Sequence, residues 1–149
     1  MTRLPHAALL ACLVALPACA QDSPRLEQAI EKLRQNKIAE ARAELEALVT
    51  AEPGNARAEA YLAAAEIQGG DLAKAMERAH RLLRADPANA DLHELLGQAY
   101  MLNRDWALAE KAWRGVLQER PNSEEARFQL ANALLQLGQP VGRGRRRRG

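Results

Sequence analysis

The sequence predicts an all-α protein in which helix-turn-helix units repeat to form a solenoid. The first observation is a period of 34 residues, at which Pro53, Pro87 and Pro121 coincide when the chain is aligned with itself. The second is a helical spacing of apolar residues on both sides of a short polar break. The third is composition, because 48% of the residues are hydrophobic but only 3% are aromatic, which leaves alanine and leucine to fill the core. Closely packed helices suit such a core.

The clearest unit lies between Ala90 and Pro121. Its first helix carries four residues on one face, namely His93, Leu96, Gly97 and Tyr100. A polar break at residues 103–105 follows, and the second helix carries another stripe, made of Trp106, Ala109, Trp113, Val116 and Leu117. Two helices with apolar faces and a short turn between them form an antiparallel hairpin.

Small residues recur where the two helices of each hairpin should cross. Ala41, Ala75 and Ala109 coincide in the second helices, and the first helices carry Ala29, Ala63, Gly97 and Ala131 at one position. A period of 34 residues, small crossing residues and a terminal proline together resemble the tetratricopeptide repeat. The third unit is most similar to the family pattern, through Leu96, Gly97, Tyr100, Ala109, Trp113 and Pro121.

The resemblance implies one tetratricopeptide repeat domain over residues 21–138. Its repeats would occupy about 22–55, 56–89 and 90–123, and a capping helix would follow at 123–138. Gln28, Lys32 and Glu66 depart from the family pattern at positions that are usually apolar. In repeat one we attribute this to the end of the stack, where no earlier repeat covers the first one.

Local signals define the helices of the first repeat. Asp22 or Ser23 can cap the first helix, and Pro24 stands in its first turn, where the missing amide proton costs nothing. This helix should run to about Asn36, and its partner should occupy about residues 38–51.

The later helices follow from glycine, proline and capping residues. Repeat two should form helices over residues 56–68 and 71–85, joined at Gly69-Gly70, because glycine accepts the left-handed backbone that ends a helix. Repeat three should turn at Arg104, between Asn103 and Asp105. A seventh helix, capped by Asn122 or Ser123, should run to Gly138 and solvate the last repeat through a polar outer face of Glu124, Glu125, Arg127, Gln129, Asn132 and Gln136.

Residues 1–20 have the pattern of a secretory signal peptide. Arg3 precedes an apolar run of ten residues from Ala7 to Leu16, which is too short to span a bilayer. Ala18-Cys19-Ala20 predicts a cleavage site that would leave Gln21 as the amino terminus of a periplasmic protein. The alternative is a segment similar to a lipobox at residues 16–19, with acylation of Cys19 and attachment to the outer membrane.

Residues 139–149 form a basic tail that contains Arg143 and Arg145 to Arg148 among glycines and has no apolar face. We expect it to be disordered. Without these five arginines and Arg3, 15 basic residues stand against 19 acidic ones, so the repeats carry a net charge near −4. Two alternatives remain open: the tail binds anionic lipid or nucleic acid electrostatically, or the chain is a truncated or frameshifted fragment of a longer repeat array.

The sequence offers little for catalysis. Its hydroxyl nucleophiles beyond residue 20, tyrosines aside, are Ser23, Thr50 and Ser123, which all stand near predicted helix ends. His80 and His93 are better explained by solvation and by helix packing than as metal ligands. No glycine-rich phosphate loop or Cys/His cluster occurs. We therefore expect no enzymatic activity, no cofactor and no metal.

The expected function is binding of another protein or peptide, because stacked helix hairpins offer an extended groove. The resemblance implies that the groove is lined by first-helix residues, here Arg34, Arg57, Gln68, Asp91, Glu94, Gln98, Met101, Phe128 and Asn132. Family members that grip a carboxyl-terminal peptide use a lysine and asparagine clamp, whereas this chain has Leu26, Ile30, Tyr61, Asp91 and Leu95 at those positions. The partner would belong to an envelope assembly or secretion complex, membrane contact would require acylation of Cys19, and nucleic acid is not favoured as the main ligand.

Overall fold

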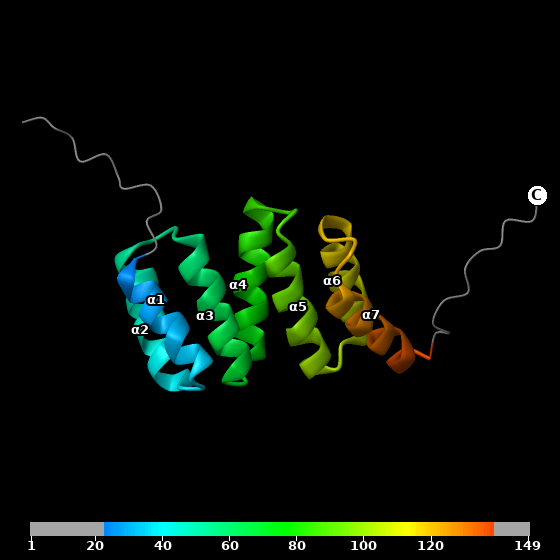
Figure 1. Cartoon of the computed structure of the whole chain (residues 1–149), viewed down its shortest axis with the longest axis horizontal. Helices are drawn as coiled ribbons and strands as arrows, with labels where there is room; N and C mark the ends of the chain where they lie inside the picture. The colour runs from blue at the N-terminus through cyan, green and yellow to red at the C-terminus, as the bar shows by residue number, and fades with distance from the viewer. Residues whose placement is uncertain (1–22, 139–149) are drawn as a thin grey trace, which may run out of the picture.

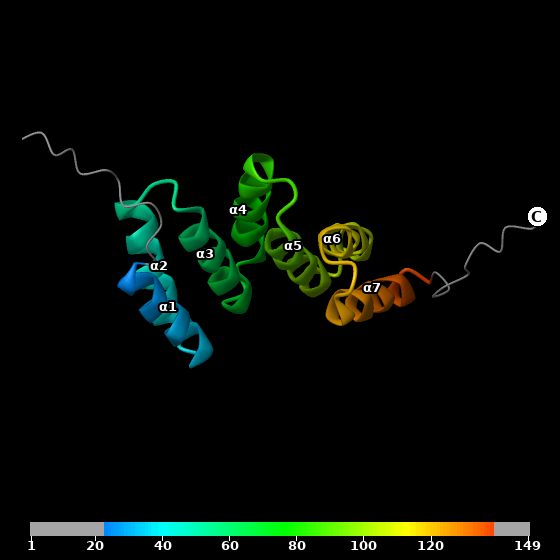
Figure 2. The ribbon, with the colours of Figure 1, turned by 45° about the horizontal axis from the view of Figure 1, so that its top comes forward.

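A computed structural model describes residues 23–138, and this part of the chain folds into a row of seven helices without strands (Figure 1). The helices are α1 (Pro24–Arg34), α2 (Ile38–Ala51), α3 (Ala56–Gln68), α4 (Leu72–Ala85), α5 (Ala90–Asn103), α6 (Trp106–Glu119) and α7 (Glu124–Gln136). Each helix packs on the next, and α3 also contacts α1 and α5 (Figures 1 and 2). The predicted all-α repeat fold is confirmed. The predicted signal peptide, Cys19 and the basic tail lie outside the described residues.

A left-handed residue follows α1, α3, α5 and α7, one or two residues after the helix ends. Asn36, Gly70, Arg104 and Gly138, each one repeat apart, have φ angles of 59°, 88°, 63° and 69°. The turn at Gly69-Gly70 is therefore as predicted, and α5 ends at Asn103 as expected. Helix α1 ends at Arg34, two residues before the predicted end, because Asn36 has already left the helical conformation.

Helix crossings use the small residues that the sequence indicated. Ala29, Ala41, Ala63 and Ala109 are completely buried, and Ala75 is almost so. At the third crossing a Cβ added to Gly97 would lie 2.6 Å from Cε2 of Trp113, so only glycine leaves room for the indole ring. Trp113 is 1% exposed, whereas Trp106, nearer the turn, is only half-buried.

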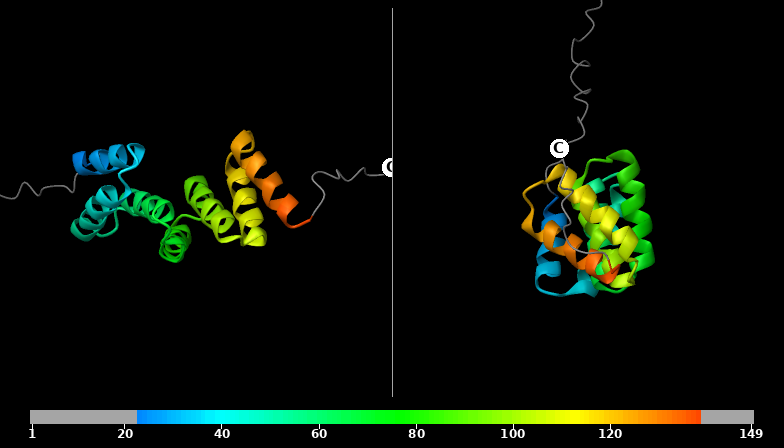
Figure 3. Two further views of the ribbon diagram at one scale, coloured as in Figure 1. Left: turned by 90° about the horizontal axis from the view of Figure 1, so that it is seen from below. Right: turned by 90° about the vertical axis from the view of Figure 1, so that its right-hand side faces the viewer.

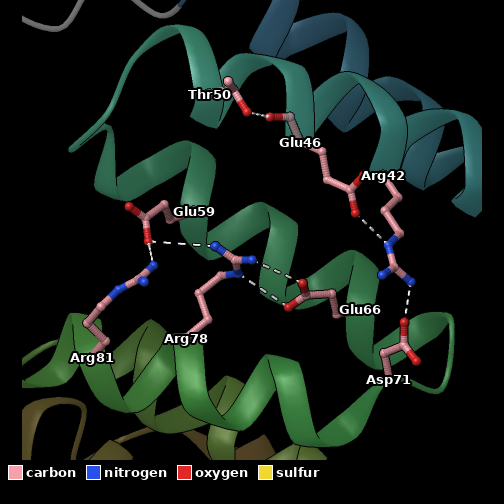
Figure 4. Close-up of polar contacts among 8 residues, drawn as sticks. All are labelled: Arg42, Glu46, Thr50, Glu59, Glu66, Asp71, Arg78 and Arg81. Carbon is pink, nitrogen blue, oxygen red and sulfur yellow. Dashed lines mark hydrogen bonds and ion pairs between the residues drawn. The ribbon is translucent and has the colours of Figure 1, made fainter.

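Charged pairs occupy one position inside the first two hairpins. Nζ of Lys32 lies 2.5 Å from Oε1 of Glu44 in repeat one. In repeat two the signs are reversed, and Arg78 on α4 holds both carboxylate oxygens of Glu66 on α3, at 3.1 and 3.3 Å (Figure 4). Repeat three has Tyr100 and Ala112 at these positions, both buried.

This pairing corrects the explanation given for Lys32, whereas Gln28 is exposed and the end-of-stack explanation for it stays a prediction. Lys32 is half-buried and ion-paired, so the lack of an earlier repeat does not account for it. Glu66 is 1% exposed and depends on Arg78 for its counter-charge. A polar residue at this position is explained by the oppositely charged residue on the other helix of the same hairpin. Comparison of one helix between repeats does not reveal that partner.

The outer face of α7 carries two large apolar residues besides the expected polar ones. Its predicted polar residues are exposed or half-buried, but Phe128 and Leu135 are 65% and 62% exposed. Helix α7 lies at the end of the row, and no described element lies beyond it (Figure 3). The predicted polar face is therefore present, but two large apolar side chains also remain uncovered on this helix.

Replacement of the buried Glu66–Arg78 ion pair by the residues of repeat three should separate the cost of an unpaired buried charge from the contribution of the pair itself. Arg78→Ala leaves the buried carboxylate of Glu66 unpaired and should lower the free energy of unfolding by about 3–5 kcal/mol. The double variant Glu66→Tyr/Arg78→Ala, which reproduces Tyr100 and Ala112, should recover most of that loss. Urea denaturation measures both.

Arg81→Ala provides the matched control, because Arg81 is mostly exposed. Its partner Glu59 still has a counter-charge in this variant, since Arg78 lies 3.8 Å away. Equal losses in Arg78→Ala and Arg81→Ala, or a double variant no more stable than Arg78→Ala alone, would contradict this account.

Candidate protein-binding groove

An open hollow of about 560 Å³ lies between α3 and α5, the first helices of repeats two and three, and extends to the loop after α4. We call it the α3–α5 groove. Its volume is in the range of small-molecule pockets, so it can hold a few amino-acid side chains. Its lining consists of Ala56, Arg57, Ala60, Tyr61, Ala64, Leu82, Ala85, Asp86, Asn89, Asp91, Leu92, Glu94, Leu95 and Gln98.

The walls of the α3–α5 groove are mainly apolar. Ala56, Ala60 and Ala64 stand one helical turn apart on α3, and their small side chains leave the space open. Tyr61 and Leu95 are half-buried beside this alanine stripe. A side chain that entered the groove would therefore be removed from water mostly by apolar atoms.

Arg57 stands at the edge of this apolar region. Its guanidinium carbon lies 5.8 Å from the centre of the Tyr61 ring, within the range of a cation–π interaction. A nitrogen of the same guanidinium lies 3.4 Å from Oε1 of Glu27 on α1. Arg57 therefore links the groove to the first repeat.

Carboxylates surround the other side of the groove. Asp91 and Glu94 share one counter-charge, because Arg120 lies 2.6 Å from Asp91 and 3.8 Å from Glu94. Burial raises the pKa of the Glu94 carboxyl, and the charges of Asp91 and Glu125 raise it further, while Arg120 opposes them. This rim has more negative than positive charge and favours a cation.

The structure brings together four of the nine predicted groove residues. Arg57, Asp91, Glu94 and Gln98 line the α3–α5 groove. The other five lie elsewhere: Arg34 and Gln68 are exposed at the ends of α1 and α3, Met101 is half-buried against the core, and Phe128 and Asn132 are on α7. A binding role for any of the nine stays a prediction.

The sequence prediction missed the alanine wall. Ala60 and Ala64 line the groove, yet alanine was assigned to the core. Tyr61 and Leu95, which stand at the clamp positions of the family, line the groove as well. The four-residue spacing of the alanines was the available signal. At the clamp positions, Leu26 and Ile30 are only 1% and 5% exposed and cannot touch a peptide.

His80 and His93 both contact other residues of the chain. A Cβ added to Gly115 would lie 2.7 Å from Nδ1 of His93, and Nε2 of His93 lies 2.9 Å from the carbonyl oxygen of Pro87, so His93 packs between helices as predicted. Nε2 of His80 lies 2.6 Å from the hydroxyl of Tyr100. Within residues 23–138 no three histidine, cysteine, aspartate or glutamate side chains are placed to hold a metal ion, and no helix is long and apolar enough to cross a membrane.

Comparisons with known proteins identify the repeats. One tetratricopeptide repeat model matches residues 32–99, and a second matches residues 77–124 and 94–142. No curated protein matches the chain.

Solved tetratricopeptide repeat structures have the same fold. A MamA structure from MSR-1 has a TM-score of 0.67 and 23% identity over 77% of this chain and 66% of its own. The P58(IPK) TPR domain has a TM-score of 0.71 and 18% identity over 76% of this chain and 33% of its own. The first TPR domain of Spaghetti (RPAP3), bound to an HSP90 peptide, has a TM-score of 0.70 and 21% identity over 76% of this chain and 92% of its own. At these identities the likeness shows the fold alone.

The raised pKa of Glu94 predicts a pH-dependent stability difference. A carboxyl whose folded pKa is raised destabilises the fold while it is ionised, and this penalty is lost as the pH falls through the folded pKa. Glu94→Gln should therefore melt at a higher temperature than the wild type at neutral pH. The difference should shrink as the pH falls and vanish below the ordinary glutamate value of 4.5.

Glu119→Gln, at an exposed carboxylate on α6, controls for the loss of one negative charge. A Glu94→Gln variant whose melting temperature stays at or below that of the wild type throughout the titration would show that Glu94 is not penalised by its surroundings.

Proposed function

Because the chain belongs to the tetratricopeptide repeat family, we propose that it is a non-enzymatic scaffold that binds another protein or a peptide in the α3–α5 groove. Proteins of this fold generally mediate protein–protein interactions. The observation that carries the proposal is the groove itself, an open apolar hollow between two neighbouring repeats with a carboxylate rim. The HSP90 peptide bound to the Spaghetti (RPAP3) domain gives the proposal a precedent in the same fold.

The chemistry of the groove indicates the kind of segment that it would take. Ala60, Ala64 and Leu95 leave room for one or two apolar side chains. Asp91 and Glu94, with Arg120 as their shared cation, favour a lysine or arginine nearby in the ligand. The ligand is therefore a segment in which a bulky apolar residue stands close to a basic one. This differs from capture of a terminal carboxylate, which would bring a negative charge to an acidic rim.

Filling the groove should abolish binding without unfolding the protein. Ala64→Arg places a long side chain in the hollow from a half-buried position on α3. Ala47→Arg adds the same residue at an exposed position on α2, away from the groove. We expect the wild type and Ala47→Arg to capture the same proteins from an envelope extract, and Ala64→Arg to lose them at an unchanged melting temperature. Capture that is equal in all three would exclude this groove as the binding site.

We also propose that the protein acts in the bacterial cell envelope, as part of an assembly or secretion complex. The support is the apolar run from Ala7 to Leu16 and the cleavage pattern at residues 18–20. The mature chain would begin at Gln21 in the periplasm, or would be anchored to the outer membrane through acylated Cys19.

Fractionation and labelling should distinguish the two export routes. Cleavage after Ala20 gives a soluble periplasmic protein whose first residue, read by amino-terminal sequencing, is Gln21. Acylation instead gives palmitate labelling that is lost in Cys19→Ala. Retention of residues 1–20 in a cytoplasmic protein would contradict both routes and with them the envelope location.

A further inference from the structure

Helix α7 carries an apolar face that no described element covers. Four large apolar side chains are mostly or nearly half exposed in residues 23–138, and two of them, Phe128 and Leu135, lie on this helix. They stand seven residues apart, which is close to two helical turns, so they point to the same side. Ala131 and Asn132 lie between them and are half-buried. The helix forms one end of the row, so this face is open to another molecule (Figures 1 and 3).

The face is complementary to itself. Phe128 and Leu135 are equally far from a point between Ala131 and Asn132. A two-fold axis through that point makes two α7 helices antiparallel and places Phe128 of each copy beside Leu135 of the other. Ala131 at the centre allows the close approach of roughly 8–10 Å that packed helices require. Such an isologous contact forms a closed dimer.

The charges on α7 favour the antiparallel arrangement. Its ionised side chains, Glu124, Glu125 and Arg127, all lie in its first turn and a half, and residues 128–138 carry no charge. An antiparallel pair sets each charged end against an uncharged one, whereas a parallel pair would set the glutamates against one another.

The opposite end of the row is unsuited to this face. Helix α1 exposes Pro24, Arg25, Gln28 and Glu31 there, so it offers polar groups where Phe128 and Leu135 need apolar ones. Head-to-tail stacking of copies would bury these polar groups without partners. The self-complementary end is therefore the one that pairs.

We propose that two copies of the chain dimerise through α7, around a two-fold axis near Ala131. The α3–α5 groove is lined by α3, α4, α5 and the loop after α4, and none of its lining residues lies on α7. The dimer therefore presents two grooves and can bind a partner with two segments, or two partners, with a gain from avidity. The dimer stands on the α7 face alone, so it does not depend on whether the groove binds a peptide.

Sedimentation velocity from low micromolar to several hundred micromolar concentrations tests the dimer. We expect the full chain to dimerise with increasing concentration, and Phe128→Glu and Leu135→Glu to weaken the dimer by at least about tenfold. Leu102→Glu, at a residue on α5 with 61% exposure, is the matched control and should dimerise like the wild type.

A disulfide across the axis provides the second measurement. Asn132→Cys, in a chain with Cys12→Ser and Cys19→Ser, should form a disulfide-linked dimer on oxidation, and Leu102→Cys in the same background should not. A wild type that stays monomeric over the whole range overturns the proposal. So does a dimer that survives both glutamate variants, or an α7 face that associates only with a different protein.

Discussion

Close crossing of neighbouring helices is the constraint on which this structure depends. Ala29 and Ala63 on the first helices are completely buried, and a Cβ added to Gly97 at the same position would lie 2.6 Å from Cε2 of Trp113. Because each crossing involves only adjacent helices, the core is a series of small clusters along the row and has no single centre. Stability in such an array is approximately a sum of repeat and neighbour terms, so each hairpin must satisfy its own packing.

The three repeats satisfy that constraint with different chemistry. In repeats one and two an ion pair joins the two helices of the hairpin, Lys32–Glu44 and Glu66–Arg78 respectively. The first helix carries the positive charge in repeat one and the negative charge in repeat two. Arg42 adds a link between these repeats by hydrogen bonding to Asp71 at the start of α4, and this contact lowers the pKa of Asp71 (Figure 4). Repeat three uses aromatic residues, with Trp113 fitted against Gly97. A residue at one of these positions can therefore be understood only together with its partner.

This coupling explains how far the sequence could predict the structure. The 34-residue period, the small crossing residues and the turn at Gly70 can be recognised along the sequence without knowing which residues pack together. The fold class and most helix ends were therefore predicted correctly. The counter-charge of Glu66 and the exposure of Leu135 depend on what lies opposite, which helical periodicity does not contain. Periodicity assigns a residue to a face, but it does not show whether another element covers that face. The groove was half predicted for the same reason, since alanine was assigned to the core and Ala60 and Ala64 line the groove instead.

The same small residues that allow the helices to cross also create the groove. Helix α3 contains six alanines, of which Ala58, Ala63 and Ala65 are buried against neighbouring helices. The other three, at 56, 60 and 64, line the α3–α5 groove. Because α3 carries small side chains on both sides, it can approach its neighbours closely and still leave an open space next to α5. Alanine on the groove side contributes little to the core, so larger residues could fill this side without disturbing the crossings. The absence of such residues from α3 is what leaves the groove open, and it places the proposed binding surface where repeats two and three meet.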